Sequence, residues 1–97
     1  MNRQQTEYPL KARMKILPTL RLIKDFRREP NNPKNPRNQI VWRVCQWSSS
    51  PVPWFEKRKV YVKKDGTEQN YKMMGLGLDD LAFVSAHWGE ILEALQA

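Results

Sequence analysis

Basic and aromatic side chains are frequent between residues 43 and 72 of this sequence. Lysine and arginine can neutralise phosphate groups, and the flat rings of tryptophan and tyrosine are surfaces on which unpaired bases stack. Single-stranded nucleic acid is bound by both kinds of group together. The sequence therefore offers a set of candidates for phosphate contact or stacking: Arg43, Trp47, Trp54, Lys57, Lys59, Tyr61, Lys63, Lys64 and Lys72, with Tyr71 as a further stacking candidate.

The four tryptophans divide into two groups. Trp42 lies in a run of β-branched and aromatic residues, and Trp88 lies on the apolar stripe of a helix, so both are expected in the core. For Trp47 and Trp54 the sequence leaves core and binding surface equally open.

Catalytic chemistry finds little support in the residue inventory. The single His and the single Cys lie on different predicted elements, so neither a nucleophile with its base nor a multi-ligand metal site can be assembled. The adjacent Asp79 and Asp80 are ordinary at a helix start, and residues 75–77 lack the Gly-Lys-Ser/Thr ending of a phosphate loop. The prediction is a non-enzymatic protein without cofactor, metal or small-molecule substrate.

The charge of the chain is unevenly distributed. Its net charge is +7, and all 17 Lys and Arg residues lie within residues 1–78 with six acids, whereas residues 79–97 carry four acids and no base. A basic body favours nucleic acid or an anionic membrane surface as partner, and a solvated basic surface without partner is the alternative. One cysteine excludes an internal disulfide, and no run is long enough for a membrane span, which favours a cytoplasmic or nucleoid-associated protein.

A β-hairpin is the most clearly predicted element. Residues 55–64 and 67–74 are strand-like and flank Asp65-Gly66, a pair typical of tight hairpin turns. Alternation places Val60 and Val62 on one side of the first strand, interpreted as core. It places the basic side chains and Tyr61 on the other side, interpreted as a surface for an anion.

The other elements follow from composition and periodicity. Residues 1–13 are predicted to be a flexible basic arm, and residues 14–97 a single domain. Strands are expected over residues 14–26 and 39–47, separated by a mobile basic loop over residues 27–38, which contains three prolines and four asparagines. That loop either clamps a nucleic acid backbone or only connects the strands. A second loop covers residues 48–53.

Residues 79–95 are predicted to form one amphipathic helix with Asp79 or Asp80 as N-cap. Its apolar stripe consists of Leu81, Val84, Trp88, Ile91, Leu92 and Leu95. Phe83 and His87 widen that stripe, as expected of a helix that packs both on its own sheet and on another copy. The predicted dimer interface is Phe83, His87, Trp88 and Ile91. The fold class is thus α+β, with a four-stranded antiparallel sheet followed by one C-terminal helix.

The hairpin and helix together resemble the positive cofactor four family of transcriptional coactivators and its bacterial and phage single-stranded-DNA-binding relatives. The matching residues are Arg58-Lys59-Val60-Tyr61-Val62, Asp65-Gly66, Lys72, Gly75-Leu76-Gly77-Leu78-Asp79 and Phe83. The chain departs from the family in its long Asn/Pro segment and in Met74, where the family has lysine. The resemblance implies a curved four-stranded sheet backed by a C-terminal helix, a homodimer formed through the helices, and a sheet surface that binds single strands.

Three functions follow from these observations. The first is a homodimeric single-stranded-DNA-binding protein acting in transcription, replication or repair. The second is a protein-interaction module whose basic sheet docks an acidic partner. The third is binding of RNA by the same face, because stacking and phosphate contact do not distinguish the two sugars.

Overall fold

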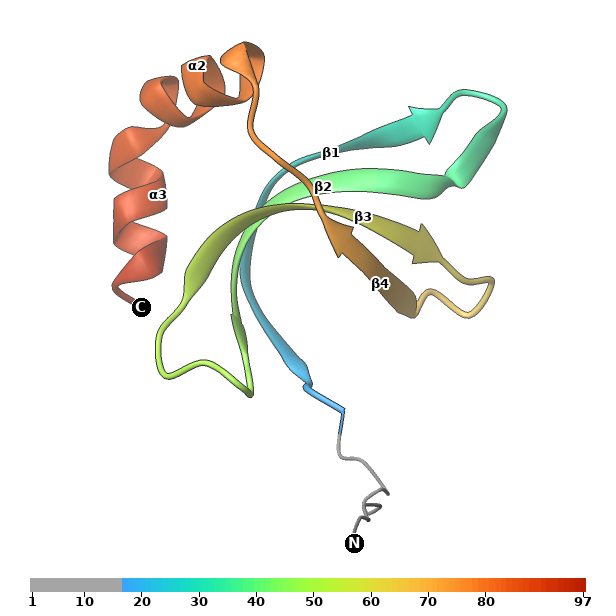
Figure 1. The fold of residues 1–97 in the computed structure, drawn as a ribbon, viewed down its shortest axis with the longest axis horizontal. Coiled ribbons are helices and arrows are strands. Elements are labelled where there is room, and N and C mark those ends of the chain that lie inside the picture. Colours follow the sequence, from blue (N-terminus) through green and yellow to red (C-terminus); the bar gives the residue numbers. More distant parts are fainter. Residues whose placement is uncertain (1–16) are drawn as a thin grey trace, which may run out of the picture.

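The computed structural model describes residues 17–97 and contains a four-stranded antiparallel sheet with strands in the order β1-β2-β3-β4. Two helices follow the sheet, so the predicted α+β class and four-stranded antiparallel sheet are confirmed, whereas the single C-terminal helix is not (Figure 1). The arm predicted over residues 1–13 lies outside the described residues. The elements are β1 (Leu20–Asn32), β2 (Asn35–Trp47), β3 (Trp54–Val62), β4 (Glu68–Met73), α2 (Leu78–Ala86) and α3 (Trp88–Leu95).

The mobile loop predicted over residues 27–38 is wrong, because these residues form the end of β1, a short turn and the start of β2. Only Pro33 and Lys34 form the turn, and Asn32 pairs with Asn35 across it. The positions of the prolines explain why these residues can still form strands. Pro30 lies on an edge strand, and Pro36 precedes the first β2 residue that pairs with β3, so neither removes a needed donor from the centre of the sheet.

The first strand is irregular along its length. Its register with β2 shifts between Leu22 and Lys24, between Asp25 and Arg27, and between Pro30 and Asn32. Each shift is a bulge-like irregularity, and such irregularities increase local twist and bend the strand. The strands of Figure 1 are accordingly twisted and curved rather than flat.

The hairpin predicted around Asp65-Gly66 is confirmed. Gly66 has φ 88°, which side chains other than hydrogen disfavour, and its N–H donates to Lys63 O at 3.0 Å. Asp65 Oδ1 accepts from Thr67 N at 2.9 Å and stabilises the turn further. The β1–β2 turn and the β3–β4 turn lie at one end of the sheet, and the helices lie at the other end (Figure 1).

The single helix predicted over residues 79–95 is divided in two at His87. The His87 ring folds back, stacks on Phe83 with centroids 4.2 Å apart, and places Nδ1 3.0 Å from Phe83 O. Gly89, just after the break, further weakens helix continuity, by about 1 kcal/mol relative to alanine. The predicted N-cap is also wrong, because Gly77 is the N-cap and Asp80 occupies the third helical position.

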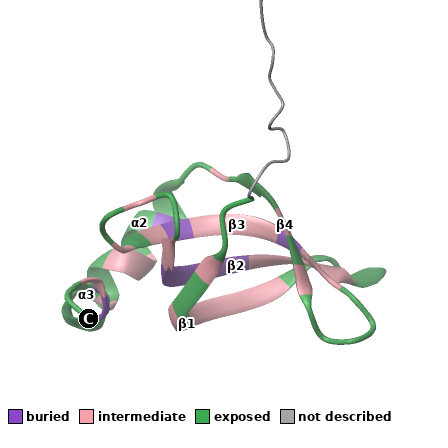
Figure 2. Cartoon of the chain, turned by 90° about the horizontal axis from the view of Figure 1, so that it is seen from below, coloured by how far each residue is buried: buried purple, intermediate pink, exposed green. Residues whose placement is uncertain are grey.

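Burial is concentrated along β2, in the middle of the sheet, whereas the turns are exposed (Figure 2). A small apolar core forms where Val44 meets Ile91 and Ala94 of α3. Trp42 is buried as predicted, but Trp88 is 56% exposed, so the prediction that Trp88 belongs to the core is wrong for the single chain. The break at His87 explains this, since α3 turns Ile91 rather than Trp88 toward the sheet.

Candidate nucleic-acid interface

The predicted binding residues lie on two opposite faces of the sheet. Residues paired across antiparallel strands share a face, and Lys57 pairs with Trp42 whereas Glu56 pairs with Arg43. We call the face of Trp42, Val44 and Phe55, on which the helices pack, the helix face. The other, which carries Arg43, is the Arg43 face. The helix face includes Lys57, Lys59 and Tyr61, and the Arg43 face includes Trp47 and Trp54.

Lys57 is engaged with the first helix rather than free for a phosphate. Its Nζ lies 2.8 Å from Asp80 Oδ2, and Trp42 Nε1 donates to Asp80 Oδ1 at 2.7 Å. Gly77 N also donates to Asp80 Oδ2, at 2.8 Å. Burial alone would raise the pKa of Asp80, but the hydrogen bonds from Lys57, Gly77 and Trp42 outweigh it and lower that pKa to about 2. The contact therefore fixes the start of α2 on the sheet.

The other half of the helix face, toward the hairpin turns, carries a groove of about 540 Å³. All four strands contribute to its lining, through Asn31 of β1, Asn38 of β2, Lys59 of β3, and Tyr71 and Lys72 of β4, with Met74 beyond. Neither lysine forms an ion pair within residues 17–97. Tyr71 is 41% exposed, so the groove combines free cations with an accessible ring.

Further cations surround this end of the sheet. Lys63 and Lys64 are exposed at the turn between β3 and β4, and Lys34 is exposed at the other turn. Arg37 donates to Val62 O at 3.1 Å, which holds it beside the β3–β4 hairpin. The acidic helices lie at the opposite end (Figure 1), so the charge asymmetry of the sequence is also an asymmetry in space.

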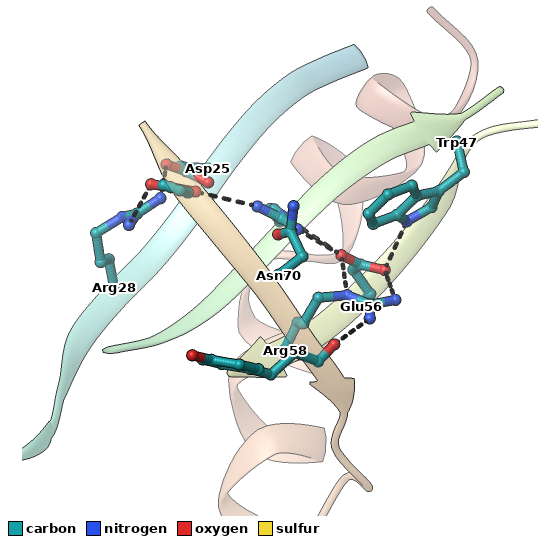
Figure 3. Close-up of polar contacts among 9 residues, drawn as sticks. Asp25, Arg28, Trp47, Glu56, Arg58 and Asn70 are labelled. Carbon is teal, nitrogen blue, oxygen red and sulfur yellow. Dashed lines mark hydrogen bonds and ion pairs between the residues drawn. The ribbon is translucent and has the colours of Figure 1, made fainter. Parts of the chain in front are cut away.

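The prediction that Arg43 contacts phosphate is wrong, because its side chain is 1% exposed. Arg43 Nε donates to Glu56 Oε2 at 3.0 Å, and Nη2 donates to Asn70 Oδ1 at 2.7 Å. Glu56 also accepts from Arg58 and from Trp47, so it is the centre of the network in Figure 3. Although burial acts to raise the pKa of Glu56, these hydrogen bonds lower it to about 2.

The network continues across the Arg43 face to the edges of the sheet. Arg43 Nη1 lies 3.5 Å from Glu68 Oε1 on β4, and Arg28 of β1 binds the same carboxylate. Asp25 Oδ2 accepts from Arg28 Nη2 at 3.1 Å (Figure 3). The three arginines Arg28, Arg43 and Arg58 are thus balanced by three acids, and this face offers little net charge to a polyanion.

Trp47 and Trp54 line a second cavity, of about 400 Å³, on the Arg43 face. Trp47 is held by Glu56 and by Arg58, whose Cζ lies 5.0 Å from the ring centroid. Trp54 is 55% exposed and donates its Nε1–H to Ser50 Oγ at 2.6 Å. Trp54 is therefore an accessible surface tryptophan, and Trp47 is half-buried against the network.

The four residues predicted at the dimer interface differ in how far they are buried. Ile91 is buried in the core of its own chain, so the prediction that it contacts a second copy is wrong for this arrangement. Phe83 and His87 are half-buried against each other, and Trp88 is exposed. The large apolar residues exposed on the two helices are Leu78, Leu81, Trp88 and Leu92.

Sequence reasoning missed several residues of these sites. Arg58 shares a face with Val60, on the side interpreted as core, and it was not among the candidates for phosphate contact or stacking. Asn31 and Asn38 were assigned to a loop, and only the two-residue turn between β1 and β2 brings them to the groove. No signal in the sequence alone indicates that pairing.

Comparisons with known proteins identify no relative of this chain. No protein-family model, curated protein or solved structure matches the chain. Within residues 17–97 no three His, Cys, Asp or Glu side chains gather as ligands for a metal ion. Neither α2 nor α3, the two helices of that range, has the length and apolar character needed to cross a membrane.

Proposed function

We propose that this chain is a non-enzymatic single-stranded-DNA-binding protein of the positive cofactor four type, acting in the cytoplasm in transcription, replication or repair. The observation that carries the proposal is the groove lined by Lys59, Tyr71 and Lys72. Two lysines that form no ion pair within residues 17–97 can follow a phosphate backbone while the tyrosine ring stacks on a base. The same groove accommodates RNA by the same chemistry, since neither contact reads the sugar.

The shape of the groove favours a single strand over a duplex. Residues from all four strands line it, so it crosses the sheet rather than following one strand. Stacking on Tyr71 requires a base whose face is free, and in a duplex those faces are covered by neighbouring bases. Stacking of this kind contributes about 1–3 kcal/mol per base and tolerates any sequence. The proposed groove is therefore expected to bind single strands with little base specificity.

We also propose that the chain is a homodimer joined through its helices. Leu78 is 83% exposed and Trp88 is 56% exposed, and both lie on the helices that follow the sheet. A second copy that covers these side chains would remove apolar surface from water, at about 25 cal/mol per Å². The hairpin-turn end of the sheet, where the groove lies, stays open in such a dimer because the helices are at the opposite end (Figure 1).

A fluorescence-anisotropy titration against salt tests the binding proposal. Labelled oligo-dT is expected to bind more tightly than a duplex of equal length, and an oligo-U arm measures the preference between the sugars. The variant with Lys59→Ala and Lys72→Ala should bind more weakly, with a log–log salt slope less negative by about 1.4, because each phosphate contact contributes about −0.7.

A matched control is the variant with Arg21→Ala and Lys24→Ala. It loses the same charge from exposed positions on β1 that lie outside the groove. Its salt slope should stay close to that of the native protein. Equal losses in the two double variants would mean that net charge rather than the groove governs binding. Binding to an acidic protein with no response to oligo-dT would favour a protein-interaction module instead.

A further inference from the structure

The cavity on the Arg43 face is separate from the groove of the proposed function. Its lining includes Trp47, Trp54, Arg58 and Met73, whereas the groove lies on the helix face. Its volume of about 400 Å³ falls within the usual range of ligand sites. Its two tryptophan rings offer flat apolar surfaces, and neither ring belongs to the groove of the proposed function.

The charged groups and the indole N–H groups of this cavity are already paired within the protein. Glu56 accepts hydrogen bonds from Trp47 and Arg58, and the indole N–H of Trp54 is donated to Ser50. The charge of Arg58 is balanced by Glu56, with Arg58 Nε 2.9 Å from Glu56 Oε2. An occupant therefore meets ring faces rather than free charges, which favours a flat neutral group over an anion or a cation.

The fourth strand connects the cavity to the groove. Tyr71 and Lys72 line the groove on the helix face, and Met73, the next residue along the strand, lines the cavity on the Arg43 face. Because β4 is an edge strand, no other strand separates the two sites at that side of the sheet. A flexible chain held in the groove can pass around this edge and reach the cavity.

We infer that the cavity formed by Trp47 and Trp54 receives one unpaired base of a nucleic acid strand whose phosphates lie in the Lys59 and Lys72 groove. The base stacks on Trp54, the more exposed of the two rings, and the strand crosses the free edge of β4. This inference rests on the proposed function and extends it to a site on both faces of the sheet.

Paired changes in the protein and in the oligonucleotide test this inference. Trp54→Leu, which keeps an apolar side chain but removes the ring, should weaken oligo-dT binding roughly ten-fold, within the usual range for stacking. Trp54→Phe should restore most of the affinity. An oligo-dT with one abasic nucleotide, moved along its length, should lose a similar amount at one position, and Trp54→Leu should add nothing to that loss.

The outcomes separate the inference from the proposed function. Unchanged affinity in Trp54→Leu would overturn the inference that the cavity binds a base. The same conclusion would follow if the losses from Trp54→Leu and from the abasic nucleotide added up at every abasic position. In either case, weaker binding by the Lys59 and Lys72 double variant would still support the groove. A ring requirement at position 54 without an effect of the two lysines would overturn the groove and the inferred path of the strand around β4, and would leave Trp54 as a stacking site only. Leu22→Ala, an exposed apolar change on β1 outside both sites, is the control and should bind like the native protein.

Discussion

Arg28 Nη1 lies 2.8 Å from Glu68 Oε2, although Arg28 is on β1 and Glu68 is on β4, with two strands between them. Neighbouring strands are about 4.8 Å apart, so the backbones of the first and fourth strands of a flat sheet would be about 14 Å apart. Only fully extended side chains could span that distance, so the contact favours a sheet that curls toward the Arg43 face. This curl allows Val60 to be buried on the face that carries no helix.

The Arg28–Glu68 ion pair is expected to stabilise the curled sheet. A double-mutant cycle with Arg28→Ala and Glu68→Ala should give a coupling energy of about 0.5–1 kcal/mol in urea unfolding, since both side chains are partly buried. The control is the Arg27–Glu29 pair, which is more exposed and lies within one strand. A larger coupling in that control pair would contradict the role given to the curl.

Asp80 should be essential for the attachment of α2. Asp80→Asn keeps the size of the side chain but removes the charge beside Lys57, and breaking such a buried pair typically costs about 3–5 kcal/mol. Asp79→Asn is the matched control, because Asp79 is exposed at the preceding position, and its cost should be within roughly 0.5 kcal/mol. Chemical denaturation followed by circular dichroism measures both, and equal effects would show that Asp80 acts only through the helix dipole.

Stability should fall in acid through Glu56 and Asp80. The folded pKa of Glu56 is about 2, below its ordinary value of 4.5, and that of Asp80 is about 2, below 3.8. The unfolded chain therefore binds protons first, so the stabilisation is complete above about pH 5 and is lost as the pH falls toward 2. Urea unfolding at several pH values should show this decline, and Glu56→Gln should make it shallower. A decline of unchanged steepness in Glu56→Gln would place the acid sensitivity elsewhere.

Trp88 and Ile91 should respond in opposite ways. Ile91→Ala should destabilise the protein by about 2–5 kcal/mol, because Ile91 is buried against Val44. Trp88→Ala should have little effect on the fold of one chain but should shift the proposed dimer toward monomer. Sedimentation velocity at several concentrations gives the second result. Native protein that sediments as a monomer throughout would reject the helix-mediated dimer.

The β3–β4 hairpin was predictable from the sequence because its signals are local. Asp65-Gly66 requires a turn, and alternation around Val60 requires a strand. The β1–β2 hairpin was not predictable, because prolines and asparagines are typical of loops. Strand pairing is possible there for two reasons. Pro30 lies on an edge strand, and the pairing of β2 with β3 begins only at Asn38, so Pro36 has no partner on β3.

The candidate site was predictable in its residue types but not in its arrangement. Alternation correctly separates Lys59 from Val60, yet it does not say which face the helices cover. Arg43 shows the same limit: an arginine on a strand suggests a phosphate contact, and only the pairing of β2 with β3 brings Glu56 beside it. Trp88 fits the helical stripe in sequence, and the break at His87 turns it outward.

Two of the register shifts, which insert Ile23 and Phe26 into β1, are also expected to protect the protein from self-association through its sheet. An exposed regular edge strand is a template on which another chain can add, and this is a route to fibrils. Bulges interrupt the row of backbone donors and acceptors on β1, and Pro30 removes one donor outright. The opposite edge, β4, is only six residues long. We therefore expect concentrated solutions of the protein to resist amyloid-like aggregation.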